Sequence, residues 1–246
     1  MRVPVVQGLI ERRVLVNFRV DPDVMQRHVP APFRVATVDG HAIAGICLIR
    51  LAQERPRFVP RWAGLRSENA AHRVAVTWDT ADGPRDGVFV LRRDTSSALN
   101  VWVGGRLFPG THHRARFEVA EHANRVDIAM RSTDGATRVL VRGTVAAALP
   151  EGSVFADLDA ASRFFERGAV GWSPNVRAGC FDCLELCSVG WRVEPLAVEH
   201  VESSWLDDAA NFPRSAVAFD SALLMRGIEH RWVAHAAMPT AAGALH

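Results

Sequence analysis

The sequence predicts a mainly β protein (α+β) with a few short helices, in which antiparallel strands form a barrel or a pair of packed sheets. Three observations support this fold class. Several segments alternate apolar with polar side chains, which is the pattern of a half-buried strand. Turn sequences rich in glycine, proline and aspartate separate these segments. Few segments fit a helix, and those that do are short.

The alternating segments define the expected strands. The Asp134-Gly135 pair lies between two of them and favours a tight hairpin turn. A second group of strands is expected late in the sequence. In order, the expected strands cover residues 13–20, 72–78, 87–92, 114–119, 125–130, 137–145, 185–191 and 196–203.

Two segments carry the start and stop signals of a helix. The first covers residues 21–28, with Asp21 as its N-cap and Pro22 in its first turn. The second begins at Asp157 or Asp159 and ends near Arg167, where Gly168 would be the C-cap. No linker, low-complexity stretch or repeat divides the sequence, so we expect a single domain over residues 1–246.

Composition and charge exclude several classes of protein. The chain is 48% hydrophobic and 23% charged, as in ordinary soluble globular proteins. Its net charge is only +2 and charges of both signs are interspersed, so we expect no nucleic-acid partner. The first residues lack the pattern of a signal peptide, and no apolar run approaches the roughly 18 residues of a membrane span. We therefore expect a cytoplasmic protein with no membrane partner.

The cysteines and histidines do not favour a metal site. Cys180 and Cys183 form a C-x-x-C pair, but on a strand they would point to opposite faces, and no second pair completes a zinc site. We interpret the thiols as buried, unreactive groups. The histidines show neither H-x-H nor H-E-x-x-H spacing. We expect no metal and no cofactor.

Several motifs resemble a known superfamily. The run from Arg19 to Pro32 is similar to the opening helix of acetoacetate decarboxylase-like proteins, with the pattern R-x-D-x-D followed by V-P-x-P. Four further blocks resemble the uncharacterised bacterial domain-of-unknown-function family 2071 of that superfamily. The resemblance implies a cone-shaped antiparallel β-barrel with a few short helices, a small-molecule pocket inside it, and assembly into a homo-oligomer. The four blocks cover residues 67–73, 92–97, 104–113 and 219–230.

The chain contains no lysine, whereas acetoacetate decarboxylase forms a Schiff base with one. Counting forward from Arg106 places the vacated lysine position at His113, while aligning on Pro109 places it at Gly110. Neither residue has an amine, and arginine cannot supply a neutral one. The α-amino group of Met1 is the sole amine left in the sequence that could form a Schiff base. We therefore expect that Schiff-base decarboxylation is lost.

The same resemblance implies catalytic residues. Glu68 corresponds to the active-site glutamate of the superfamily, and a carboxyl group in an apolar cavity can act as acid or base. A salt bridge to Arg66, Arg73 or Arg93 is the alternative role for Glu68. His112 and His113 flank the vacated lysine position and face opposite ways on a strand, so at most one should enter the barrel. The count from Arg106 favours His113.

Arg106, Arg93, Asn69 and Arg13 are the candidate substrate-binding residues. A buried guanidinium would bind a carboxylate through two hydrogen bonds, and Asn69 could orient a carbonyl group. The alternative is a structural network of arginines with Asp94. Two functions follow from these residues. One is a lyase, isomerase or hydrolase that acts on a small carboxylate or carbonyl compound by acid-base catalysis. The other is a non-catalytic pocket for a small apolar acid, and convergence of Glu68 with a histidine would favour the enzyme.

Overall fold

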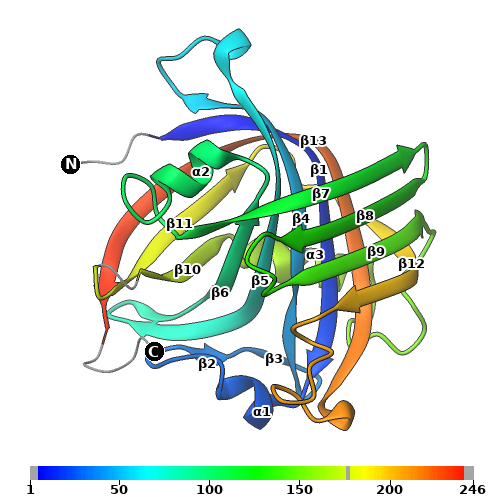
Figure 1. Ribbon diagram of the computed structural model, residues 1–246. Coiled ribbons are helices and arrows are strands. Elements are labelled where there is room, and N and C mark those ends of the chain that lie inside the picture. Colours follow the sequence, from blue (N-terminus) through cyan, green and yellow to red (C-terminus); the bar gives the residue numbers. More distant parts are fainter. Residues whose placement is uncertain (1–4, 176–177, 241–246) are drawn as a thin grey trace.

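The computed structural model describes residues 5–175 and 178–240, and most of them belong to one strongly curved β-sheet (Figure 1). The strands are β1 (Val6–Val20), β2 (Arg34–Val35), β3 (Thr37–Val38), β4 (His41–Pro56), β5 (Leu65–Thr80), β6 (Gly83–Thr95), β7 (His112–His122), β8 (Arg125–Ser132), β9 (Arg138–Val145), β10 (Val170–Asn175), β11 (Cys180–Ser188), β12 (Glu194–Ser203) and β13 (Val217–Pro239). The α-helices are α1 (Pro22–Gln26), α2 (Ala98–Val103) and α3 (Leu158–Arg167). No described helix is long and apolar enough to cross a membrane.

The strand pairings close the sheet into two rings that share a wall. One ring runs β13-β1-β4-β5-β6-β10-β11 and returns to β13; we call it the seven-strand ring. The other runs from β6 through β7, β8, β9 and β12 to β13, and returns along the shared strands β1, β4 and β5. We call this the nine-strand ring. In Figure 1 the strands β10 and β11 lie on one side of the shared wall, and β7, β8 and β9 lie on the other.

The shared wall has a sequence signature of its own. Because successive side chains on a strand point to opposite faces, neighbouring residues on a shared strand enter different rings. Both faces are therefore buried, and residues 42–49 of β4 form an unbroken buried run. Two hydrophobic clusters result. Val14 and Val16 belong to one cluster, whereas Leu15 and Cys47 belong to the other.

The sequence predicts the outer strands and two helices correctly. Strands β7, β8 and β9 contain the expected alternating segments, and Gly135 has a positive φ of 74° in the predicted hairpin turn. Asp157 caps α3 by accepting a hydrogen bond from the Ala160 amide at 2.7 Å. Asp21 caps α1 in the same way, by accepting from the amides of Asp23 and Val24.

Other elements are absent from the sequence predictions. Strands β4, β10 and β13 were not expected, and β4 lacks alternation because both of its faces are buried. Helix α2 was not expected either, because its residues Leu99, Val101 and Val103 alternate with polar or aromatic ones as in a strand. Ser97 nevertheless caps α2 by accepting a hydrogen bond from the Asn100 amide at 3.2 Å.

Candidate functional site

A cavity of about 660 Å³ lies inside the seven-strand ring. Every strand of this ring contributes to its wall, and α2 with the loop after it lies at its mouth. Two apolar side chains at the mouth are exposed: Leu99 is 47% and Leu107 is 56% accessible to solvent. The strands contribute Arg13 from β1, Cys47 from β4, Asn69 and Arg73 from β5, Arg93 from β6, Gly171 from β10, Leu184 from β11 and Trp232 from β13.

Three arginines meet at the cavity, and we call Arg13, Arg73 and Arg93 the arginine cluster. Strand register brings them together. Cys47 is paired with Ala71, and Ala71 with Arg93, so the side chains of this row share one face of β4, β5 and β6. Arg73 follows Ala71 by two residues and therefore lies on the same face. Three separate strands thus direct a cation into one space.

The guanidinium groups of the arginine cluster have only neutral partners. Arg13 Nε donates a hydrogen bond to the Cys47 sulfur at 3.2 Å, and Arg73 Nη2 donates to Asn17 Oδ1 at 2.7 Å. Arg93 Nη2 lies 3.5 Å from the Ser173 hydroxyl. None of the three forms an ion pair with a carboxylate of residues 5–175 or 178–240. The Nε atoms of Arg73 and Arg93 are buried without any hydrogen-bond partner in that part of the chain.

Burial raises the free energy of the charged forms of Arg73 and Arg93. It lowers the pKa of Arg73 to about 10, and the nearby Arg13 cation contributes to the shift. Burial also lowers the pKa of Arg93 to about 10. Both groups stay protonated at neutral pH, so the protein maintains positive charge in a desolvated cavity. An anion would relieve that cost.

His112 is the predicted histidine that reaches the cavity. It lies at the start of β7, opposite Arg93, and its Nδ1 is 2.9 Å from the Gly110 carbonyl oxygen. Because a carbonyl can only accept, Nδ1 carries the proton and Nε2 keeps its lone pair. Burial and the Arg93 charge lower the pKa of His112 to about 3. The imidazole is therefore neutral and can accept a hydrogen bond.

Asn69 also lines the cavity, but its amide is held by its surroundings. Its Nδ2 donates to the Ser67 hydroxyl at 3.0 Å and lies 3.4 Å from the Ile49 carbonyl oxygen. Arg106 lines the cavity from its exposed mouth, where Nη1 donates to the Trp102 carbonyl at 2.8 Å. Both of these predicted residues thus border the cavity, although neither belongs to the arginine cluster.

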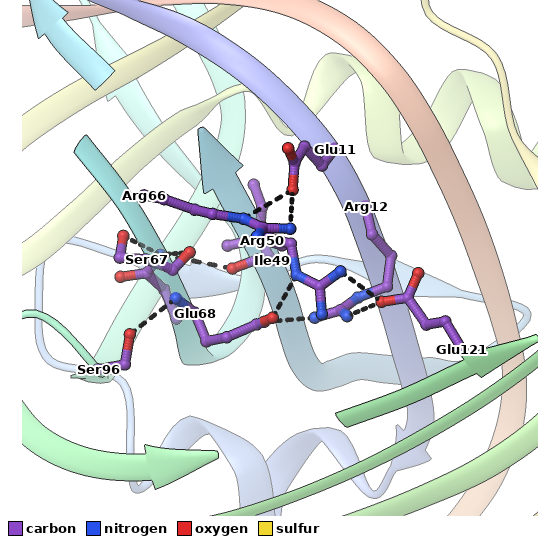
Figure 2. A network of polar contacts seen from close by, with 10 residues as sticks. Glu11, Arg12, Ile49, Arg50, Arg66, Ser67, Glu68, Ser96 and Glu121 are labelled. Carbon is purple, nitrogen blue, oxygen red and sulfur yellow. Dashed lines mark hydrogen bonds and ion pairs between the residues drawn. The ribbon is translucent and has the colours of Figure 1, made fainter. Parts of the chain in front are cut away.

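Glu68 does not line the cavity, and the expectation that it lies in an apolar pocket is corrected by the structure. It precedes Asn69 on β5 and therefore enters the nine-strand ring. There its carboxylate accepts hydrogen bonds from Arg12 and Arg50, each at 2.5 Å (Figure 2). Glu121 completes this buried ion network by pairing with both arginines. The arginine partners are not those expected from the sequence.

His113 also points away from the cavity, as the strand alternation requires for one of the two histidines. It is partly exposed and its Nδ1 lies 3.5 Å from Asp134 Oδ2. Gly110, the other candidate for the vacated lysine position, lies beside the arginine cluster. Its φ is +86°, and a Cβ at this position would be 2.7 Å from Arg93 Nε. Met1, which carries the remaining amine, lies outside the described residues.

Cys47 and Arg73 are site residues that were not predicted from the sequence. Cys47 lies on β4, whose uniform burial gave no strand signal. Arg73 was considered only as a partner of Glu68. The spacing of Asn69, Ala71 and Arg73 by two residues would have placed Arg73 beside the predicted Asn69. The four cysteines also differ in exposure: Cys47 and Cys183 are buried, whereas Cys180 and Cys187 are partly exposed.

A family model matches most of the chain. The model is DUF2071, described as an uncharacterized conserved protein, and it covers residues 10–173. This range contains the arginine cluster, Cys47 and His112. No curated protein matches the chain.

Solved structures with the same fold have low sequence identity to this chain. Acetoacetate decarboxylase from Legionella pneumophila is 10% identical with a TM-score of 0.61, and the match covers 95% of this chain and 88% of that one. An acetoacetate decarboxylase-like enzyme from Sphingomonas wittichii RW1 is 14% identical with a TM-score of 0.60, covering 98% and 94%. The enduracididine biosynthesis enzyme MppR complexed with pyruvate is 12% identical with a TM-score of 0.57, covering 96% and 90%. These matches confirm the acetoacetate decarboxylase-like fold.

Proposed function

The chain belongs to the DUF2071 family and has an acetoacetate decarboxylase-like fold, and on that premise we propose that its cavity binds a small organic acid. The carboxylate would meet the arginine cluster, and the apolar part of the acid would extend toward the mouth. One observation carries this proposal. Three cations face one cavity, and none of them has a carboxylate partner in the described part of the chain.

The energetics favour an anionic ligand over a neutral one. A buried cation without a counter-charge costs several kcal/mol, and native proteins usually pair such groups. No member of the arginine cluster forms an ion pair with a carboxylate of the described residues, although Glu68 and Glu121 lie on the other side of the shared wall. A carboxylate ligand would supply the missing charge and accept hydrogen bonds from the Nε atoms of Arg73 and Arg93.

Cavity shape indicates the class of acid. The arginine cluster lies deep, since Arg73 is only 4% exposed, whereas the mouth has two exposed leucines beside the exposed Arg106. A ligand of one carboxylate and an apolar chain or ring matches this gradient, and about 660 Å³ suits a small molecule. The related fold of MppR, whose complex holds pyruvate, supports a carboxylate as the ligand class.

Acid-base catalysis on the bound acid is the second candidate function, and His112 is the residue that favours it. Its neutral Nε2 could accept a proton or hydrogen bond from a ligand held by Arg93. Binding is the primary proposal because Glu68 lies in the other ring. The carboxylates that line the cavity, Glu54 and Asp94, lie beside His230 and Arg92. A His112→Gln variant separates the two: it should retain acid binding, and it should lose turnover if the protein is an enzyme.

Thermal unfolding with matched ligand pairs tests acid binding. We expect hexanoate, benzoate or pyruvate to raise Tm, while hexanamide, benzamide and pyruvamide do not, because the amides lack the negative charge. At a concentration of about 100 times Kd, a ligand adds about 2.7 kcal/mol of stability, which corresponds to a rise of roughly 5–10 °C for a chain of this size. Equal shifts from acid and amide, or no shift from any acid at millimolar concentration, would contradict the proposal.

A further inference from the structure

Cys47 is placed unlike the other cysteines, because its sulfur lies within the arginine cluster. The sulfur accepts the hydrogen bond from Arg13 Nε at 3.2 Å. Cys47 on β4 is paired with Ala71 on β5, which is paired in turn with Arg93 on β6. Ala71 alone therefore lies between Cys47 and Arg93, and its side chain is too short to shield one from the other. Cys47 is 7% exposed, and that exposure is to the cavity whose wall it forms.

The arginine cluster surrounds the Cys47 sulfur. Arg13 donates a hydrogen bond to it, and Arg73 and Arg93 lie on the same face of the neighbouring strands β5 and β6. A thiolate is the nucleophilic form of cysteine, and neighbouring cations stabilise it. The arginine cluster is therefore a suitable environment for a nucleophilic sulfur.

An independent observation indicates a ligand at the same place. Arg73 is 4% exposed, lines the cavity, and has a buried Nε without a hydrogen-bond partner among the described residues. A buried donor in this position requires an acceptor that the described chain does not supply. An acceptor bound there would lie next to the Cys47 sulfur, because Arg13 and Arg73 are both members of the cluster around it.

The remaining cysteines have the opposite electrostatic environment. Burial and the carboxylates of Glu185 and Asp182 raise the pKa of Cys183 to about 12. Burial and Asp182 also raise the pKa of Cys180. Burial and Glu185 raise the pKa of Cys187, although the Arg231 cation acts in the opposite direction. Their thiols are therefore weak nucleophiles at neutral pH, although Cys180 and Cys187 are more exposed than Cys47.

We propose that Cys47 is a nucleophile that attacks small carboxylates whose neighbouring carbon is electrophilic, such as 2-oxo acids. This assignment rests on the proposed function, because the arginine cluster would hold the carboxylate while the adjacent carbon faces the sulfur. With a 2-oxo acid, a sulfur–carbon bond forms and the π bond of the carbonyl group opens. The carbonyl oxygen takes up the proton that the thiol has lost, so the adduct is a hemithioketal and no oxidant or reductant is needed.

Alkylation with a charged and a neutral reagent tests the assignment. Iodoacetate carries a carboxylate next to its reactive carbon, and iodoacetamide is its neutral counterpart. In both reactions a sulfur–carbon bond forms, iodide leaves, and the thiol proton passes to solvent. We expect iodoacetate to modify Cys47 about tenfold or more faster than iodoacetamide, because the arginine cluster concentrates the anion. Peptide mass spectrometry over time gives the rate at each cysteine.

Cys180 and Cys187 are internal controls in the same samples. Asp182 beside Cys180 repels iodoacetate, and Cys187 lies between Glu185 and Arg231, so neither cysteine attracts the anion. Iodoacetamide should therefore react with both at least as fast as iodoacetate does. In the Arg93→Met variant, the rate of iodoacetate at Cys47 should fall by about tenfold, while the rates at the control cysteines stay the same. A Cys47 that stays unmodified, or that reacts with iodoacetamide as fast as with iodoacetate, overturns the assignment.

Failure of this assignment is distinguishable from failure of acid binding. If hexanoate raises Tm while Cys47 stays unmodified, the cysteine assignment is wrong and acid binding stands. The Cys47→Ser variant should lose the fast alkylation site. If no acid raises Tm and both reagents modify Cys47 equally, the cysteine assignment and acid binding are both wrong.

Discussion

Replacing Arg12 by methionine is expected to lower the free energy of unfolding by about 3–5 kcal/mol. Arg12 is 1% exposed and joins Glu68 of β5 to Glu121 of β7 inside the nine-strand ring. Its loss would leave two partly buried carboxylates, 15% and 28% exposed, to share Arg50. The pKa of Arg50 is raised, because its hydrogen bond and attraction to Glu68 outweigh the opposite effect of burial. The charges of this network therefore stabilise one another. Urea denaturation of both proteins measures the difference.

Arg66→Met is the matched control for this prediction. Arg66 also pairs with a glutamate, Glu11, and the two closest atoms are 2.7 Å apart. Its side chain is 64% exposed, so water screens the pair and its removal should change the free energy of unfolding by less than about 1 kcal/mol. Similar losses in the Arg12 and Arg66 variants would contradict the view that burial makes the Arg12 network decisive for stability.

Replacing Arg93 by methionine should weaken acid binding ten- to a hundredfold, because a hydrogen bond to a charged group contributes about 1.5–3 kcal/mol. The same variant should be more stable than the wild type without ligand, by about 1–2 kcal/mol, because a buried unpaired cation is removed. The pKa of Arg93 in the folded protein, about 10, lies below its ordinary 12.5. Its destabilising effect is therefore full below about pH 10 and declines as the pH rises toward 12.5.

The combination of higher stability and weaker binding is the diagnostic result for Arg93. Thermal unfolding with and without hexanoate measures both effects in one experiment. Arg116→Met is a suitable control, since Arg116 is exposed on β7 and should alter neither the stability nor the ligand shift appreciably. If Arg93→Met is less stable than the wild type and binds hexanoate equally well, Arg93 is a structural residue rather than a ligand-binding one.

The sequence was sufficient for the fold class and insufficient for the arrangement of the rings. Strands with one solvated face, such as β8, alternate and were predicted directly. β4 separates the two rings, and the burial of both its faces removed the alternation on which the prediction depends. The motifs from Arg19 onward still indicated the fold, because their resemblance to a known superfamily did not depend on periodicity.

The residues of the candidate site were also predicted only in part. Arg13, Arg93 and His112 were predicted and line the cavity, whereas Glu68 and His113 were predicted and point away from it. The ring that a side chain enters changes with each residue along a shared strand: Glu68 and Asn69 are neighbours in the sequence but enter different rings. Motif resemblance locates the segment, and only strand register determines which side of the shared wall each side chain occupies. Cys47 could not be predicted as a site residue because its strand had not been recognised.

A crystal structure of the protein soaked with 4-iodobenzoate tests the central claim most directly. The iodine atom gives an anomalous signal that fixes the orientation of the ligand independently of the carboxylate density. We expect the carboxylate between Arg73 and Arg93, and the iodine toward Leu99 and Leu107 at the mouth. Binding in the reverse orientation, or at a site outside the seven-strand ring with the cavity empty, would contradict the conclusion that the arginine cluster is a carboxylate-binding site.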